Sequence, residues 1–284
     1  MKKILVPIDF SKLSHNAVEF AAHLAKPMKA EVVVVHFENI PLDDTSLHLS
    51  GEAHSSGFSE DSLFNAQLFR ANKKKLQDLS VEFSGDGVTV TGLQLGGGFL
   101  EGVKHFIDKN GADLIVIGTT GEASIQEFFS GNHTEQLIEH LETPVLSVQE
   151  KVDKNIKEVV LGIDLLDEAY SKKAFEMVKT LTESLNATLH IVDVVDTDSK
   201  GVIMHDLNKL ARNSGLKNYM VDVIKDKKPN EALMKFADRE DAGLIITLSE
   251  AKAGLHRFFQ HSFATRMTKE SAIPVLTINK GKLQ

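Results

Sequence analysis

The sequence predicts an α/β protein made of two tandem open parallel sheets, each with five strands and with helices on both faces. Short apolar runs that suit buried strands alternate along the chain with stretches of helical periodicity. This alternation is typical of parallel sheets, because a helix usually makes the crossover between two parallel strands. The chain also repeats itself: the run KILVPID at residues 3–9 returns as EVVLGID at residues 158–164.

The elements expected in the first copy follow one another in order. Residues 4–8 are an apolar run, and residues 11–26 have apolar positions at helical spacing behind the capping candidates Asp9 and Ser11. Further strands are expected at residues 31–37, 88–95, 114–117 and 145–148, and further helices at residues 63–83, 100–110 and 133–140. The second copy gives the same series, with strands that begin near Val159, Leu189, Met220, Leu244 and Val275.

The repeat also divides the chain. GADLIVIG at residues 111–118 matches DAGLIITL at residues 241–248, an offset of 130, whereas the first strands match at an offset of 155 (164 minus 9). The second copy is therefore 25 residues shorter (155 minus 130). The extra residues are expected between positions 41 and 69, where the Gly- and Ser-rich stretch 45–59 predicts a loop. Two domains are predicted, residues 1–150 and 151–284.

Composition excludes several classes of protein. With 32 Lys and Arg against 40 Asp and Glu, the 284-residue chain has a formal net charge of −8, which disfavours binding to nucleic acid or to anionic membranes. It has no cysteine, so disulfides and thiolate metal sites are excluded. No apolar run approaches the roughly 18 residues of a membrane span. We expect a cytoplasmic protein that binds neither nucleic acid nor membranes.

Glycines mark the expected binding site of the first copy. Gly118 and Gly121 follow the fourth strand, and after nine more residues Gly131 and Asn132 open a helix. Backbone N–H groups at a helix start form a phosphate site, and glycines let a ligand approach the backbone closely. Gly97, in a run of three glycines after the third strand, offers a second close approach, and Thr134 can add a side-chain hydrogen bond. The patterns GxxxxGK[ST] and GxGxxG are absent from the expected positions.

Together, VPIDFS at residues 6–11, the glycine spacing 118-121-131 and the closing PVLSV at residues 144–148 resemble the universal stress protein family, here in its tandem form. The resemblance implies an adenine nucleotide alpha hydrolase-like sheet of strand order 3-2-1-4-5. It also implies that the last strands of the two copies pair antiparallel, as a pseudo-dimer within one chain. A further homodimer of chains and an unknown protein partner are left open.

The resemblance also implies a ligand, because the ATP-binding members carry G-x2-G-x9-G-[S/T]. ATP or a related adenine nucleotide, with or without Mg²⁺, is therefore expected in the first copy. Carried over position by position, the adenine and ribose contacts fall on Pro7, Asp9, Phe37, Ile117 and Thr120, and the phosphate contacts on Gly121, Gly131, Asn132 and His133. The sequence departs from the family at Asn132, which replaces Ser or Thr, and at Phe37, which is bulkier than the usual Val or Ile.

The second copy is expected to keep the fold without holding ATP, because the motif glycines become Leu248, Ala251 and His261. The Leu248 side chain is expected to obstruct the ligand. No zinc site is expected, because none of the 12 histidines lies three or four residues from another.

The function expected from the sequence is that of a nucleotide-responsive stress or regulatory protein. The alternatives are a nucleotide-free interaction scaffold of the same fold and a slow ATPase. Enzyme status is left open and no catalytic residue is assigned, because the only acids near the glycine motif are Glu122 and Glu127.

Overall fold

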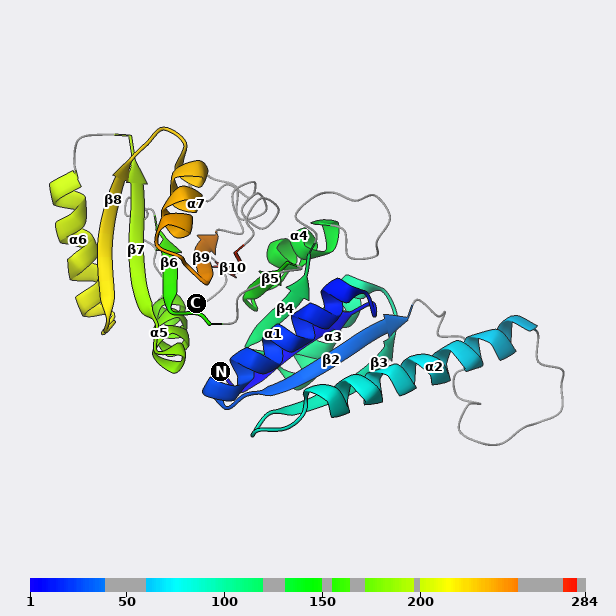
Figure 1. Ribbon diagram of the computed structural model, residues 1–284. Coiled ribbons are helices and arrows are strands. Elements are labelled where there is room, and N and C mark those ends of the chain that lie inside the picture. The colour runs from blue at the N-terminus through cyan, green and yellow to red at the C-terminus, as the bar shows by residue number, and fades with distance from the viewer. Residues whose placement is uncertain are drawn as a thin grey trace.

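A single ten-stranded sheet runs through both halves of the chain (Figure 1). The computed structural model describes residues 1–38, 60–119, 131–149, 155–163, 172–196, 200–249 and 273–279. We call residues 1–149 the amino-terminal half and residues 155–279 the carboxyl-terminal half. The strand order is β3-β2-β1-β4-β5-β10-β9-β6-β7-β8, so each half has the expected order 3-2-1-4-5.

Strands and helices alternate as the apolar pattern predicts. The amino-terminal half contains β1 (Lys3–Ile8), α1 (Lys12–Met28), β2 (Glu31–Glu38), α2 (Glu60–Phe83), β3 (Thr89–Gly96), α3 (Phe99–Asn110), β4 (Leu114–Gly118), α4 (Gly131–His140) and β5 (Val145–Val148). The carboxyl-terminal half contains β6 (Glu158–Gly162), α5 (Lys172–Leu185), β7 (Thr188–Val195), α6 (Lys200–Asn213), β8 (Tyr219–Lys225), α7 (Pro229–Arg239), β9 (Leu244–Ser249) and β10 (Val275–Asn279).

The last strands of the two halves join the sheet. β5 and β10 pair antiparallel, with Leu146 opposite Leu276, while all other neighbouring strands are parallel. The Ser147 hydroxyl adds a hydrogen bond to the carbonyl oxygen of Val275 at 3.2 Å. The expected pseudo-dimer is therefore one hydrogen-bonded sheet rather than two separate sheets, because pairing the two final strands removes two exposed edges.

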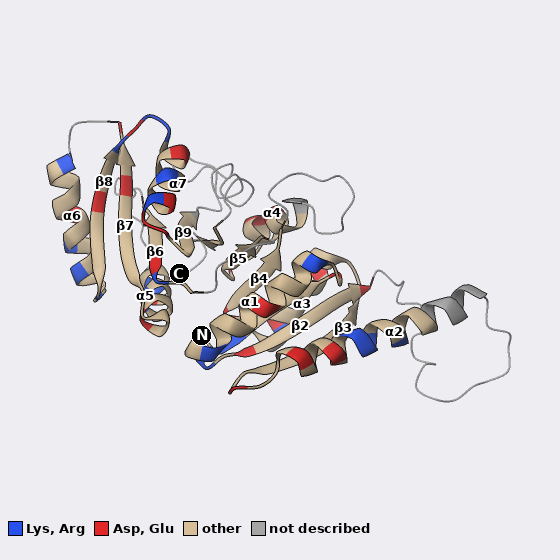
Figure 2. Cartoon of the chain, in the orientation of Figure 1, with Lys and Arg blue, Asp and Glu red and all other residues tan. Residues whose placement is uncertain are grey.

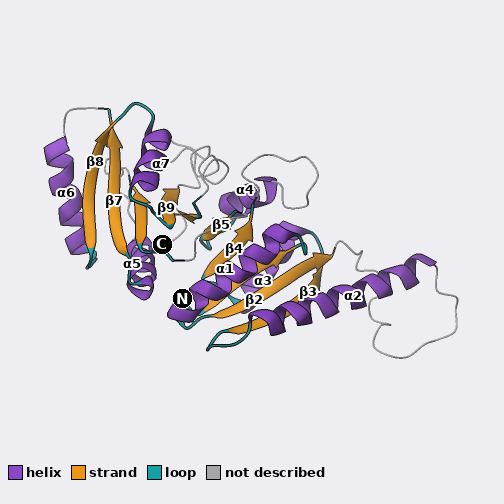
Figure 3. Cartoon of the chain, in the orientation of Figure 1, coloured by secondary structure: helices purple, strands orange, loops and turns teal. Residues whose placement is uncertain are grey.

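Helices cover both faces of the sheet, which is why its central strands are apolar on both sides (Figure 3). In the amino-terminal half, α1 and α2 pack on one face around Phe20 and Leu76, and α3 and α4 pack on the other face around Phe106 and Leu137. In Figure 2 the strands are mostly without charge, and charged residues gather on the helices and at the strand ends. None of the helices among the described residues has the length and apolarity that a membrane crossing would require.

Helix α2 differs from its counterpart in the other half. It has 24 residues, whereas α6, at the same place in the carboxyl-terminal half, has 14. The extra sequence of the first copy therefore lengthens a helix as well as adding residues 39–59, which lie outside the described part of the chain together with the expected loop. Figure 1 shows α2 extending past the end of the sheet.

Candidate functional site

The hydrogen-bonded ladder between β1 and β4 ends early. Their pairing in the described strands covers Ile4 and Leu5, although β1 stays paired with β2 up to Ile8. In the carboxyl-terminal half the corresponding strands β6 and β9 stay paired up to Gly162. The difference has a local cause, because Pro7 has no N–H to donate to β4 and Gly162, at the equivalent position, has one. Open parallel sheets hold ligands beyond the strand ends where the strand order reverses, and we call this place, at the ends of β1 and β4, the crevice.

The turn from β1 into α1 presents Asp9 at this crevice. The Asp9 carboxylate accepts a hydrogen bond from the backbone N–H of Ser11 at 2.9 Å. Ser11 in turn caps α1, where its hydroxyl oxygen accepts from the N–H of Ser14 at 3.2 Å. Phe10, between them, has a φ of 63°, which a non-glycine residue rarely adopts. Ser11 is therefore the cap of α1, and Asp9, the other capping candidate, bonds the cap residue rather than the helix.

The glycines after β3 meet no neighbouring side chain in the described part of the protein. Gly97 has a φ of 112°, which favours glycine, and its N–H donates to the carbonyl oxygen of Glu38 at 2.9 Å. Gly98 is the residue before α3 and caps that helix without a side chain. A Cβ atom added at either glycine would meet no atom within 4 Å. These two residues therefore give the close approach to the backbone that the sequence predicts.

Phe37 is directed away from this open space. Its ring lies against Gly102 of α3, where an added Cβ would come within 2.5 Å of two ring carbons. The ring also meets Phe99 edge-on at a centroid distance of 5.9 Å, and Phe99 meets His133 at 4.3 Å. Gly102 in α3 thus leaves room for the Phe37 ring, which is larger than the usual Val or Ile. The backbone of Phe37 lies at the end of β2, beside β1.

Close packing of α1 explains why residue 118 is a glycine. An added Cβ would lie 2.4 Å from the carbonyl oxygen of Leu13, so the glycine allows α1 to approach β4 closely. Its counterpart Leu248 is buried in the core of the carboxyl-terminal half. We expected the Leu248 side chain to point at the ligand's place, but it packs on the face of the sheet that α1 covers at Gly118.

Two buried hydroxyl groups flank the glycine motif. Thr119, directly after β4, and Thr134, in the first turn of α4, are essentially inaccessible to solvent. Neither hydroxyl oxygen has a hydrogen-bond partner among the described residues. Buried hydroxyl groups are nearly always hydrogen-bonded in native proteins, so the partners of these two lie beyond the described residues, in the rest of the chain or in a ligand.

The other predicted site residues divide into three groups. Ile117 is buried in the core and its backbone belongs to the ladder with β5, so the structure gives no support for its direct contact with a ligand. Gly131 begins α4, as a phosphate site at a helix start requires, while the side chain of Asn132 lies outside the described part. Thr120 and Gly121 also lie outside it.

Sequence reasoning missed Thr119, Phe99 and Gly102. Thr119 stands inside the glycine motif and could have been found there. Nothing in the sequence pairs Gly102 with Phe37, because they lie on different elements.

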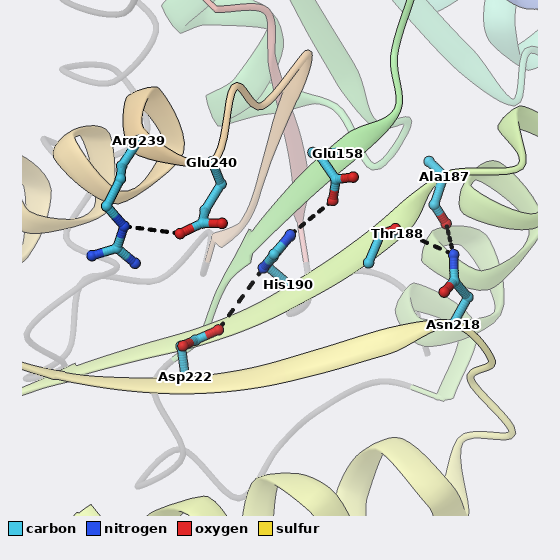
Figure 4. A network of polar contacts seen from close by, with 8 residues as sticks. All are labelled: Glu158, Ala187, Thr188, His190, Asn218, Asp222, Arg239 and Glu240. Carbon is cyan, nitrogen blue, oxygen red and sulfur yellow. Dashed lines mark hydrogen bonds and ion pairs between the residues drawn. The ribbon is translucent and has the colours of Figure 1, made fainter.

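The carboxyl-terminal half has a different polar network on its sheet (Figure 4). The Nε2 atom of buried His190 lies 2.8 Å from a carboxylate oxygen of Glu158, and its Nδ1 atom lies 3.8 Å from one of Asp222. The ring meets Phe236 of α7 at 5.7 Å. The two carboxylates face opposite sides of the imidazole, so they do not converge on one metal position. Accordingly, no cluster of three or more metal-ligating side chains occurs among the described residues.

Comparisons with known proteins agree with this geometry. A sequence model of the universal stress protein family matches residues 1–149. The chain belongs to the universal stress protein family. It is 30% identical to Universal stress protein MJ0531 of Methanocaldococcus jannaschii over 149 residues, which are 52% of this chain and 82% of that protein. It is 26% identical to Universal stress protein MJ0577 of the same organism over 156 residues, which are 53% of this chain and 96% of that protein.

The fold of the whole chain is also found in a solved structure. A universal stress protein from Archaeoglobus fulgidus has a TM-score of 0.75 and 16% sequence identity, with 98% of each chain covered. At this identity the likeness concerns the fold. It extends over both halves, so the second half of this universal stress protein shares the architecture although its glycine motif is lost.

Proposed function

We propose that this universal stress protein binds ATP or a related adenine nucleotide in its amino-terminal half and acts as a nucleotide-responsive stress or regulatory protein. The observation that carries the proposal is the early end of the ladder between β1 and β4 at the crevice. This ladder ends at Leu5 in the half that has the glycine motif, whereas β6 and β9 stay paired up to Gly162 in the half that lacks it. Open space at Gly97 and Gly98 adds support.

The residues around the crevice suit the parts of a nucleotide. The other oxygen of the Asp9 carboxylate is an acceptor for ribose hydroxyls, and the carbonyl oxygen of Phe37 can accept a hydrogen bond from the adenine amino group. The N–H groups at the start of α4 suit the phosphates, because a helix N-terminus attracts anions. Mg²⁺, where it accompanies ATP, would be held chiefly by the phosphate oxygens.

The buried hydroxyl groups of Thr119 and Thr134 offer two further contacts. Each lies beside the glycine motif and has no partner among the described residues. A nucleotide that supplies an acceptor would satisfy them, and the resulting hydrogen bonds would form in a site screened from water, where each is worth about 0.5–1.5 kcal/mol.

The proposal is tested by calorimetric titration of the purified full chain with ATP, and by chromatography of the nucleotide released when the protein is denatured. Thr119→Val keeps the volume of the buried side chain and removes its hydroxyl. We expect it to weaken ATP binding about threefold to tenfold, in line with one lost hydrogen bond. The matched control Thr247→Val changes a buried threonine of the carboxyl-terminal half and should leave ATP binding unchanged.

Other outcomes would favour the alternatives. Absence of released nucleotide together with absence of heat on titration with ATP would contradict the proposal and favour an interaction scaffold. Release of phosphate from bound ATP would favour the slow ATPase. Glu127→Gln would then be expected to remove turnover and to leave affinity unchanged.

A further inference from the structure

A buried polar cluster lies beneath α2, next to the proposed nucleotide site. Glu38, the last residue of β2, is 7% exposed, and one of its carboxylate oxygens accepts a hydrogen bond from the Asn72 amide at 2.7 Å. The Gln94 amide of β3 donates to the same oxygen. The Nε2 atom of His36 lies 3.5 Å from the Asn72 amide nitrogen and 3.9 Å from the carboxylate. We call these four residues the β2 cluster.

The fold does not require this cluster. A buried carboxylate is costly unless charge and hydrogen bonds compensate it. The pairing of β7 with β6 and β8 gives the equivalents of His36, Glu38 and Gln94 in the carboxyl-terminal half, which are Asp193, Val195 and Val223. Only one of the three is polar. The β2 cluster therefore accompanies the half with the glycine motif, which points to a role at that site.

One link runs from the cluster to Asp9. The Nδ1 atom of His36 lies 2.9 Å from the carbonyl oxygen of Ile8. Because that oxygen can only accept, Nδ1 carries the proton. The His36 ring also packs on Phe10 at a centroid distance of 4.5 Å. His36 thus holds the residues on both sides of Asp9, in a turn whose positive φ at Phe10 needs support from its surroundings.

A second link runs from the cluster to the glycines after β3. The carbonyl oxygen of Glu38 accepts the N–H of Gly97, while the Glu38 side chain is held by Asn72 and Gln94. Through backbone and side chain, Glu38 joins the turn at Gly97 to helix α2. Helix α2 also contacts the turn at Asp9 directly, because Nζ of Lys75 in α2 lies 4.9 Å above the ring of Phe10.

We infer that His36 and Glu38 are positioning residues for the nucleotide site, and that they couple it to helix α2. This inference rests on the proposed function. His36 sets the position of the Asp9 carboxylate through Ile8 and Phe10, and Glu38 sets the position of Gly97. A ligand held by both turns therefore biases the packing of α2, and a displacement of α2 changes the affinity of the site.

The two amide isosteres of His36 give a matched test. Asn at position 36 places an amide nitrogen near the Nδ1 position and can still donate to Ile8, whereas Gln places it near the Nε2 position and cannot. We expect His36→Gln to weaken ATP binding about fivefold, as measured by titration calorimetry, and His36→Asn to stay within twofold of the unmodified protein. His190→Asn alters a buried histidine of the other half as a control and should leave ATP affinity unchanged. Equal affinities for His36→Gln and His36→Asn would overturn the inference.

Hydrogen exchange without nucleotide separates this inference from the proposed function. The amides of Ser14 and His15 are bonded to Ser11, at the end of the turn that His36 supports. We expect His36→Gln to speed exchange in residues 9–16 at least threefold relative to His36→Asn. If the unmodified protein binds no ATP but this difference is found, the proposed function fails and the positioning role of His36 stands. Unchanged exchange in both variants would refute the positioning role whether or not ATP binds.

Discussion

Gly102 of α3 tests where the ring of Phe37 lies. A methyl group at position 102 would come within 2.5 Å of two carbons of that ring, about 1 Å closer than ordinary van der Waals contact. Overpacking of this kind lowers the free energy of unfolding by about 1–3 kcal/mol. The better helix propensity of alanine raises it by about 1 kcal/mol. The ring is buried against α3 and Phe99, so it cannot easily move aside. We therefore expect Gly102→Ala to lower the free energy of unfolding by up to about 2 kcal/mol.

A second substitution makes the test specific. In a chain that also carries Phe37→Val, the two ring carbons are absent, and Gly102→Ala should raise the free energy of unfolding by about 0.5–1 kcal/mol because only the helix propensity remains. Gly201→Ala serves as the control, since an added Cβ there meets no atom within 4 Å and the change should be neutral or slightly stabilising in either chain. Urea unfolding of the four chains measures these values.

The sign of the Gly102 effect decides the outcome. If Gly102→Ala destabilises the protein equally with Phe and with Val at position 37, the ring does not occupy the space beside α3. The explanation given for how the site accommodates Phe37 would then be wrong. ATP titration of the Phe37→Val chain adds an independent check, because contact through the backbone predicts that its affinity changes less than threefold.

Three further perturbations follow from the same geometry. Gly118→Ala would press a methyl group against the α1 backbone, so it should lower the free energy of unfolding, measured in urea, by about 2–3 kcal/mol. Unchanged stability would contradict the close approach of α1 to β4. His190→Val should cost about 1–3 kcal/mol, because it leaves the Glu158 carboxylate without its partner, and Glu158→Gln on the same background should recover part of that loss. Lys228 and Glu231 form an exposed pair at the start of α7, where their hydrogen bond and opposite charges raise the pKa of Lys228 and lower the pKa of Glu231. The stabilisation from the lowered carboxyl pKa is present above the ordinary glutamate range and is lost as the pH falls through the lowered value. Glu231→Gln should abolish this small dependence of stability on acid. Addition of 1 M salt should weaken it.

Much of the fold could be read from the sequence, because it depends on local patterns. The apolar run at residues 4–8 and the helical spacing at residues 11–26 predict β1 and α1 in their observed places, and the repeat predicts the same strand order in both halves. Helix boundaries were less well predicted. Helix α2 begins at Glu60 rather than at residue 63, since a polar first turn carries no apolar signal, whereas the start of α4 at Gly131 is where the glycine motif predicts it.

The candidate site could be located from the sequence but not built from it. The glycine spacing marks the ends of β4 and the start of α4, and the family resemblance adds Asp9 and Phe37. The sequence pattern did not predict the direction of each side chain. Gly118 opens space for α1 rather than for a ligand alone, and the Phe37 ring finds its place against Gly102 of another element.

The sequence alone determined that this chain repeats one α/β unit, that its first copy keeps a glycine motif, and that its second copy has lost it. Those facts depend on residue order and spacing along the chain. Only the tertiary structure decided that the ladder between β1 and β4 ends at Leu5, that β5 and β10 pair in the register that places Leu146 opposite Leu276, and that a buried carboxylate at Glu38 lies between two turns of the site. Such features depend on hydrogen bonds and packing contacts between residues that are distant in the chain. These contacts form only when the elements pack together.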